Sequence, residues 1–330
     1  MATVGTNFAT LIDIAMSKTD QMLVEILNQK NPLLQVMPWI ECNDGAGHKT
    51  KIRVGLPTPT WRALYQGVQP TKGVVAAVRD SAGNLEDFGE VDELEYELAG
   101  DDRDTWRMQE DAAHIEGMSQ MMASTFFYGN VTITPERFHG LAPRYNTLVA
   151  ATSQTAENVI TAAGAGADNT SIWLLGFGPS SLHGIYPKGT TAGLKPQDLG
   201  RQVRQETDGS RYTVLMTKYA WQAGLTLRDW RAAGRIANID VSDVRTVVNN
   251  QKALITFMIQ LSERVEEPMG SGRQYWFANK TITSALRQGI LERVSNNLTY
   301  ENVEGKRIMM FDGIPILRAD ALVNTEAVVV

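Results

Sequence analysis

Residues 49–56 read KTKIRVGL, and residues 93–98 read ELEYEL. Apolar residues alternate with Lys and Arg in the first segment and with Glu in the second. Strict alternation predicts half-buried strands, and opposite charges facing each other across an antiparallel pair contribute about 0.2–1 kcal/mol per pair. The two segments therefore predict an interrupted hairpin over residues 49–99. Its facing charges would be Lys51 and Arg53 on one arm and Glu93 and Glu95 on the other.

The connection between the two arms predicts a contact with another subunit. It is too long for a tight turn, and a two-stranded ribbon alone is only marginally stable in water. Its tip, residues 61–82, carries large apolar side chains, which usually mark a contact surface when they project. Trp, Tyr and Arg are the most frequent interface anchors, so Trp61, Arg62 and Tyr65 are the expected inter-subunit contacts. The alternative is that these side chains fold back on their own subunit.

Composition excludes several classes of protein. The 330-residue chain has a net charge of −6, 43% hydrophobic residues and one cysteine, Cys42. A single cysteine forms neither an intramolecular disulfide nor a thiolate zinc site. The dispersed cations lack the basic patch of a dedicated nucleic-acid-binding protein, and no apolar run reaches the ~20 residues that span a bilayer. Residues 1–20 lack the layout of a signal peptide, so the protein is expected to be cytosolic when synthesised.

One long helix is expected after the hairpin. Residues 100–104 (GDDRD) place acidic side chains where the helix dipole favours them, and apolar residues then follow at helical spacing. These residues are Met108, Ala112, Ile115, Met122 and Phe126. With no proline before Pro135, the helix is expected to run for about 26 residues, or ~40 Å. Ile115 and Met122 are expected to pack against a sheet.

The rest of the chain predicts an arm and a mixed domain. Residues 1–48 begin with a short helical pattern and are interpreted as an arm lying on other structure. Between residues 129 and 239, short apolar runs predict strands. Examples are residues 172–175, 212–216 and 224–227. Ser242 and Asn279 are suited to cap two further helices, and residues 312–313 (Asp-Gly) predict a final hairpin turn.

Side chains that carry enzyme chemistry show no recognisable arrangement. The four histidines have no ligand-like spacing, and there is no H-E-x-x-H motif. They are His48, His114, His139 and His183. Residues 164–167 (GAGA) lack the other residues of a phosphate-binding or dinucleotide-binding loop. The sequence therefore predicts no catalytic, cofactor-binding or metal-ligating residue, and the protein is not expected to be an enzyme.

Several motifs along the whole chain indicate the same class of protein. They are FFYGN at 126–130 with FHGL at 138–141, HGIYPKG at 183–189, GLTLRDW at 224–230 and FDGIPI at 311–316. Following an arm, a hairpin and a long helix, this order of motifs resembles the tailed-bacteriophage major capsid proteins of the HK97-like fold. Residues 183–189 and 224–230 also resemble segments of the Gp7-like major capsid family.

The resemblance implies a division of the chain and a fold. The fold would be α+β, and the hairpin would be the extended E-loop, which in this family lies over the neighbouring subunit. The implied parts are an N-terminal arm (1–48), the E-loop (49–99), a P-domain with the spine helix (100–140), an A-domain with inserted strands and loops (141–305) and returning P-domain strands (306–330).

The same resemblance implies a function. The protein would assemble as hexamers and pentamers into the icosahedral head shell of a tailed phage, enclosing the double-stranded DNA genome without sequence-specific binding, membrane or cofactor. Its partners would be further copies of itself, a separate scaffolding protein, a portal protein and a possible decoration protein. It would be located in the virion after assembly in the host bacterial cytoplasm.

Other interpretations stay open on the sequence alone. The chain could be another virion component, such as a tail or decoration protein, or an enzyme with an unrecognised site. Some proteins of the resembled fold crosslink an E-loop lysine to a neighbour's asparagine. Lys72 with Asn296 or Asn297 would be the candidate pair, although nothing in the spacing selects these residues.

Overall fold

The structure is a computed structural model that describes residues 29, 31–45, 47–246, 248–268, 270, 272–291, 298–303 and 306–330. The helical pattern expected within the N-terminal arm lies outside these residues. The α-helices are α2 (Leu33–Val36), α3 (Glu93–Leu98), α4 (Arg103–Tyr128), α5 (Val241–Thr246), α6 (Val248–Arg264) and α7 (Lys280–Leu291). The strands are β1 (Trp39–Glu41), β2 (Gly47–Gly55), β3 (Val74–Asp92), β4 (Val159–Thr161), β5 (Asn169–Phe177), β6 (Leu182–Tyr186), β7 (Leu194–Gln205), β8 (Arg211–Leu227), β9 (Ala233–Asp240), β10 (Arg273–Ala278), β11 (Leu298–Val303), β12 (Lys306–Phe311) and β13 (Ile314–Arg318).

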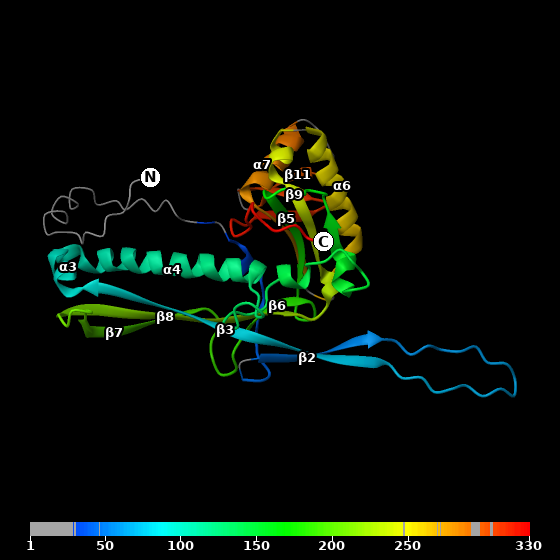
Figure 1. Ribbon diagram of the computed structural model, residues 1–330, viewed down its shortest axis with the longest axis horizontal. Helices are drawn as coiled ribbons and strands as arrows, with labels where there is room; N and C mark the ends of the chain where they lie inside the picture. The colour runs from blue at the N-terminus through cyan, green and yellow to red at the C-terminus, as the bar shows by residue number, and fades with distance from the viewer. Residues whose placement is uncertain are drawn as a thin grey trace.

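The chain forms a flat layer, a taller part beside it and a projecting ribbon (Figure 1). In the flat layer, helix α4 lies along strands β3, β7 and β8. In the taller part, helices α6 and α7 cover one face of a sheet that includes β5 and β9. The ribbon consists of β2 and the first part of β3, and it extends away from both other parts. This mixture of helices and strands confirms the α+β class.

Strand β3 joins the ribbon to the flat layer. Its N-terminal part pairs antiparallel with β2, which places Ala77 opposite Lys51 and Val75 opposite Arg53. Its C-terminal part pairs antiparallel with β8, and β8 also pairs with β7. The predicted first arm is confirmed as β2, but the hairpin returns through β3 and not through residues 93–98.

The segment ELEYEL forms helix α3, so the predicted strand is wrong. The Asp92 carboxylate accepts a hydrogen bond from the Leu94 amide at 2.8 Å, which is an N-cap interaction. Glu and Leu also favour helices over strands. Helix α3 lies at the end of the flat layer farthest from the ribbon (Figure 1). Pairing of Lys51 and Arg53 with Glu93 and Glu95 inside one subunit is therefore wrong.

Helix α4 is the predicted long helix, and its 26 residues confirm the expected length. Its C-terminal half is buried in an apolar core through Met118, Met122 and Phe126, among others. Its N-terminal half lies on the sheet through polar contacts: Arg107 donates to Thr217 at 2.8 Å, and His114 lies 2.7 Å from Asp87. The sheet-facing side of this half is therefore polar.

The predicted packing of Ile115 against the sheet is wrong, because its side chain is 41% exposed. Ile115→Asp is expected to give a soluble protein with the wild-type circular dichroism spectrum. Met122 is 2% exposed, so Met122→Asp buries an unpaired charge and is expected to give mostly insoluble protein. Soluble fractions after expression test both variants, and an insoluble Ile115→Asp protein would contradict this assignment of faces.

The taller part contains the second apolar core. Every residue of strand β5 is buried, and side chains from α6 and α7 pack on one face of the sheet. Among them are Leu254, Met258, Leu261, Ile282 and Leu286. No described helix combines the length and the hydrophobicity that a bilayer-spanning segment requires.

Three local predictions have different outcomes. Residues 212–216 and 224–227 are strand residues as predicted, but they belong to one 17-residue strand, β8. Ser242 is inside α5 and its amide donates to the Asp240 carboxylate at 2.9 Å, so Asp240 and not Ser242 caps this helix. Asn279 does cap α7, because its side-chain oxygen accepts from the Ile282 amide at 2.9 Å.

The predicted Asp-Gly turn between β12 and β13 is confirmed. Asp312 and Gly313 both have positive φ, 48° and 76°, the backbone of a two-residue hairpin turn that favours this residue pair.

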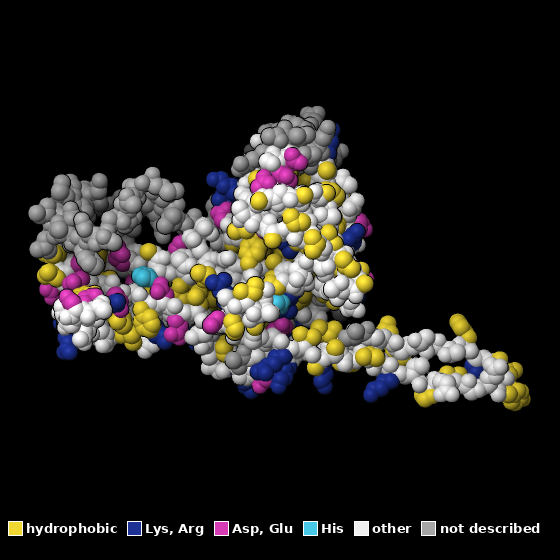
Figure 2. All heavy atoms as spheres, in the orientation of Figure 1, with side chains coloured by type: hydrophobic (Ala, Val, Ile, Leu, Met, Phe, Trp, Pro, Cys, Tyr) yellow, Lys and Arg dark blue, Asp and Glu magenta, His cyan; other side chains and the backbone are white. Residues whose placement is uncertain are grey.

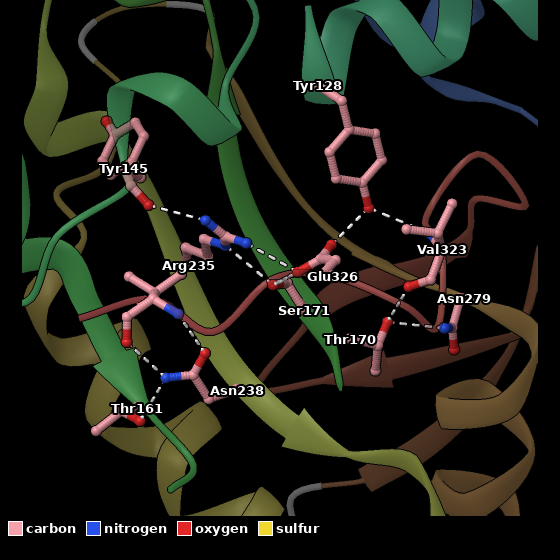
Figure 3. Close-up of polar contacts among 11 residues, drawn as sticks. Tyr128, Tyr145, Thr161, Thr170, Ser171, Arg235, Asn238, Asn279, Val323 and Glu326 are labelled. Carbon is pink, nitrogen blue, oxygen red and sulfur yellow. Dashed lines mark hydrogen bonds and ion pairs between the residues drawn. The ribbon is translucent and has the colours of Figure 1, made fainter. Parts of the chain in front are cut away.

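A buried polar network fixes the C-terminal segment against α4, β5 and β9 (Figure 3). Arg235 donates to Glu326 at 2.8 Å, to Ser171 at 2.9 Å and to the Tyr145 carbonyl at 2.9 Å. Tyr128, at the end of α4, donates to Glu326 at 2.5 Å. Burial and the neighbouring Glu326 carboxylate raise the pKa of Tyr128, so its hydroxyl stays protonated and available to donate. One carboxylate thus connects the long helix, the central sheet and the end of the chain.

Candidate assembly interface

The ribbon tip, defined as residues 56–73, projects into solvent as an extended loop (Figure 1). Trp61 and Tyr65 are fully exposed, with relative accessibilities of 101% and 105%. Other exposed apolar side chains along the tip and the adjoining strand are Leu56, Leu64, Val68, Val74 and Val75. Figure 2 shows hydrophobic side chains spaced along the projecting segment. In this structure, therefore, the expected anchors do not fold back on their own subunit.

The tip has little structure of its own. Its hydrogen bonds join the Gln66 amide to the Ala63 carbonyl at 3.3 Å, and the Thr71 hydroxyl to the Thr58 carbonyl at 3.4 Å. Tyr65 also has a positive φ of 64°, an uncommon conformation for a bulky residue. An extended segment with large exposed side chains and few internal bonds is suited to be ordered by a surface that covers it.

The ribbon is also strongly basic. Residues 47–79 contain six Lys and Arg residues and no Asp or Glu, in a chain whose net charge is −6. Lys49 and Arg79 share Asp44 at 2.9 and 3.5 Å. Lys51 and Arg53 project from the exposed positions of β2 without an ion-pair partner in the described part of the chain, and the same is true of Arg62 in the tip.

The structure divides the seven expected contact residues into two groups. Lys51, Arg53, Trp61, Arg62 and Tyr65 lie together on the ribbon. Glu93 and Glu95 lie on α3, at the opposite end of the molecule (Figure 1). Lys72 is exposed in the tip, whereas its candidate crosslinking partners, Asn296 and Asn297, lie outside the described residues.

A buried ion pair that sequence reasoning missed holds the root of the ribbon. Arg144 donates to the Asp80 carboxylate at 2.8 Å, and both side chains are largely buried. Arg144 also donates to the carbonyls of Gly140, His139 and Leu225 at 3.1–3.2 Å. The only available signal was that Asp80 is the first acidic residue after a long acid-free segment. This pair fixes the direction in which the ribbon leaves the subunit.

Two buried histidines lie beside this ion pair. The rings of His48 on β2 and His183 on β6 meet edge to face, with centroids 5.8 Å apart. Arg228 donates to His48 Nε2 at 2.7 Å. Burial lowers the pKa of His183 to about 4, assisted by the positive charge of Arg228 and by His48, and burial and Arg228 also lower the pKa of His48, against the opposing effect of Asp80. Both rings are therefore neutral at pH 7 in the folded subunit.

Acidification is expected to destabilise the ribbon root. The unfolded chain protonates these rings below about pH 6.5, whereas folded His183 takes up a proton only near pH 4. The stability that neutral His183 contributes is therefore present at pH 7 and is lost as the pH falls through this window, by about 3 kcal/mol at most. Urea unfolding between pH 7 and pH 5 measures the effect. A His183→Gln variant with an unchanged pH dependence would contradict it.

Within the described ranges, no group of three or more His, Cys, Asp and Glu side chains is placed to hold a metal ion. The ribbon combines exposed aromatic side chains, cations without an ion-pair partner among the described residues, and a root fixed by a buried ion pair.

Comparison with known proteins identifies relatives. A family model described as major capsid protein GP7 matches residues 16–330. A chain in the structure of bacteriophage Epsilon15 is 31% identical, with a TM-score of 0.75, and the match covers 100% of this chain and 99% of that one. No curated protein sequence matches.

More distant structures resemble the chain more weakly. A chain of the procapsid of bacteriophage JBD30 is 14% identical with a TM-score of 0.41, covering 95% of this chain and 100% of that one. A capsid chain of the native GTA particle is 9% identical with a TM-score of 0.45, covering 66% and 93%.

Proposed function

The chain belongs to the major capsid protein GP7 family, and from that premise we propose that its projecting ribbon is the element that joins neighbouring subunits in the shell. The protein has an HK97-like fold and is a head shell protein of a phage. The shell is assembled from many copies of it. The observation that carries the proposal is the fully exposed aromatic tip at the end of a ribbon whose root is fixed by the buried Asp80–Arg144 pair.

The proposed assembly has hexamers and pentamers that close into an icosahedral shell around double-stranded DNA. In each of them the ribbon of one subunit lies on its neighbour, with Trp61, Arg62 and Tyr65 as anchors. An element that extends from the core as an unsupported two-stranded ribbon gains stability only when another surface covers it. The exposed apolar side chains of the tip supply the area for such a contact.

The division of the chain is proposed along the same lines. The arm, E-loop, P-domain and A-domain keep the limits expected from the sequence except for strands β7 and β8, which lie within residues 141–305, and residues 306–330 return to the P-domain. Strands β7 and β8 pair with β3 beneath α4, which supports counting this hairpin with the P-domain layer.

A separate scaffolding protein, a portal protein and a possible decoration protein are the proposed further partners, and assembly is proposed to take place in the host cytoplasm. Membership in a capsid family supports a structural rather than an enzymatic role. It also favours the shell over a tail or decoration protein.

Assembly of the purified chain tests the proposal directly. We expect negative-stain microscopy to show closed shells with hexameric and pentameric units, and light scattering to show megadalton particles. If the chain does not assemble alone, the scaffolding protein is added. Tubes or rings would favour a tail protein. A stable monomer under all of these conditions would contradict a shell function.

A further inference from the structure

The ribbon leaves the flat layer at the point where strand β3 changes its partner (Figure 1). Ser81 is the last residue of β3 that pairs with β2, and Ala82 is the first that pairs with β8. Among the described strands, β2 is hydrogen-bonded to β3 alone. Side-chain bonds between this root and the body of the subunit therefore set the angle at which the ribbon projects.

Two such bonds lie next to each other. His48 on β2 and Asp80 on β3 are directly opposite in the antiparallel pair, so their side chains are neighbours on the same face. Arg228, which follows β8, donates to His48 Nε2 at 2.7 Å and to the Pro179 carbonyl at 2.8 Å. Arg144 donates to Asp80 Oδ1 at 2.8 Å. Each strand of the ribbon is thus held to the body by one arginine.

The bond from Arg228 exists only while His48 is neutral. A guanidinium donates hydrogen bonds and accepts none, so His48 Nε2 accepts and the ring carries its single proton on Nδ1. A second proton from solvent would have to bind the Nε2 lone pair that Arg228 occupies, and it would place two cations side by side. Protonation of His48 therefore breaks this bond.

Protonated His48 has another partner within reach. In the described part of the chain, His48 Nδ1 and Asp80 Oδ2 are buried and have no hydrogen-bond partner. The two residues are 4% and 6% exposed. Buried polar atoms without a partner are unfavourable, and an imidazolium donates from both nitrogens. Turning the charged ring toward Asp80 would satisfy both atoms, so the root has two alternative arrangements.

Other charged or titratable groups surround the same place. They are His183, His139, Arg144, Lys49, Arg79 and Asp44. Arg144 is bound to Asp80, and Lys49 and Arg79 share Asp44. Burial lowers the pKa of His139 and also that of His183, to about 4. Burial and Arg228 lower the pKa of His48, and the charge of Asp80 opposes them. Of the three rings, His48 is the one that accepts a bond from an arginine.

We propose that Arg228 and His48 form a proton-operated latch that sets the direction of the ribbon. With His48 neutral, Arg228 holds β2 against the body. With His48 protonated, the ring pairs with Asp80, and Arg228 releases β2. One charge biases two arrangements of the same groups, as in other histidine switches. Control of assembly by the latch rests on the proposed function of the ribbon, whereas the latch itself is a property of the single subunit.

A distance measurement on the unassembled, full-length subunit tests the latch. One spin label is attached on the ribbon at Arg53→Cys and the other on α6 at Glu263→Cys, two exposed positions. The native Cys42 is 3% exposed, so it is poorly accessible to the label. Double electron–electron resonance gives the distribution of distances at pH 7 and at pH 4.5. Circular dichroism at each pH shows that the subunit is folded, and light scattering shows that it is unassembled.

Three variants in this labelled background separate the latch from general effects of acid. In His48→Gln the side-chain oxygen accepts from Arg228 at every pH, so the pH 7 distribution is expected to persist at pH 4.5. Arg228→Met has no donor and is expected to show the acid distribution already at pH 7. His139→Gln, which removes a neighbouring histidine without such a bond, is the matched control and should respond like the wild type.

In the wild type, release of the ribbon is expected to broaden the distance distribution about twofold. The midpoint should lie below pH 6.5, the ordinary pKa of histidine, because the fold favours the neutral ring. A wild-type distribution that does not change with pH would overturn the inference, as would a His48→Gln variant that responds like the wild type. If Arg228→Met does not fold, the comparison with His48→Gln decides. Shell yield at pH 7 is measured separately: a wild type without shells contradicts the proposed function and leaves the latch intact.

Discussion

Replacing residues 57–72 by a short Gly/Ser turn is expected to leave a folded subunit that forms no shells. The tip contributes two weak hydrogen bonds and no buried apolar side chain to its own subunit. Its removal therefore leaves both apolar cores intact, and the melting temperature of the subunit should not fall. Trp and Tyr anchors at the centre of an interface each contribute about 2 kcal/mol or more, so their loss from every contact in a shell should abolish assembly.

The limits of this replacement follow from the strand pairing. The tip expected from the sequence, residues 61–82, includes the start of β3, which pairs with β2 from Val74 onward. Deleting it would remove half of the ribbon and the buried Asp80. Trp61→Ala/Tyr65→Ala is the finer variant and should reproduce the assembly defect. Phe88→Ala, an aromatic residue 45% exposed on β3, is the control. If the protein with the replaced tip forms normal shells, the ribbon is not required for assembly.

Local signals allowed part of the fold to be predicted from the sequence. Helix α4 has acidic residues at its start and no proline in its interior, strand β2 alternates, Asn279 caps α7, and the Asp312-Gly313 pair needs positive φ at both positions. In each case a few consecutive residues determine the local backbone, so the sequence alone is sufficient.

Predictions that depended on distant partners were less successful. Residues 93–98 alternate like a strand, but Asp92 caps them and their composition favours a helix. Ile115 belongs to an apolar stripe, yet α4 lies on the sheet through Arg107 and His114 at that level. Which face of a helix meets a sheet depends on the position of strands that are remote in sequence, and periodicity does not reveal it.

For the candidate interface too, local features were predicted correctly and long-range pairing was not. The aromatic tip was recognisable because a loop rarely carries so many large apolar residues, and the exposure of Trp61 and Tyr65 agrees with that interpretation. The opposite charges of the segments 49–56 and 93–98 were recognised correctly, but the structure places them at opposite ends of the subunit. Complementary charges in one sequence do not say whether they pair within a chain or between two copies.

Glu326→Ala is expected to destabilise the subunit strongly, by about 3–5 kcal/mol, because it leaves the Arg235 guanidinium buried without its counter-charge. The side chains of this pair are 4% and 3% exposed, and sequence spacing gives no indication of it. The substitution also removes the carboxylate that accepts hydrogen bonds from the hydroxyls of Ser171 and Tyr128. Urea unfolding measures the change in free energy.

An exposed ion pair of the same chemistry provides the matched control. Arg231 pairs with Asp229 at 2.9 Å and with Glu266 at 3.0 Å, but its side chain is 45% exposed. Arg231→Ala is therefore expected to cost about 1 kcal/mol or less.

Combining Glu326→Ala with Arg235→Met separates the ion pair from its surroundings. The double variant no longer buries an unpaired charge, so its loss should be smaller than the sum of the two single losses, with a coupling of roughly 0.5–3 kcal/mol. Additive losses, or a Glu326→Ala effect as small as that of Arg231→Ala, would show that the two groups do not act as a pair. Because the pair links the end of α4 to β5, β9 and the C-terminal segment, a coupling in this range means that the Arg235–Glu326 contact itself stabilises the attachment of the end of the chain.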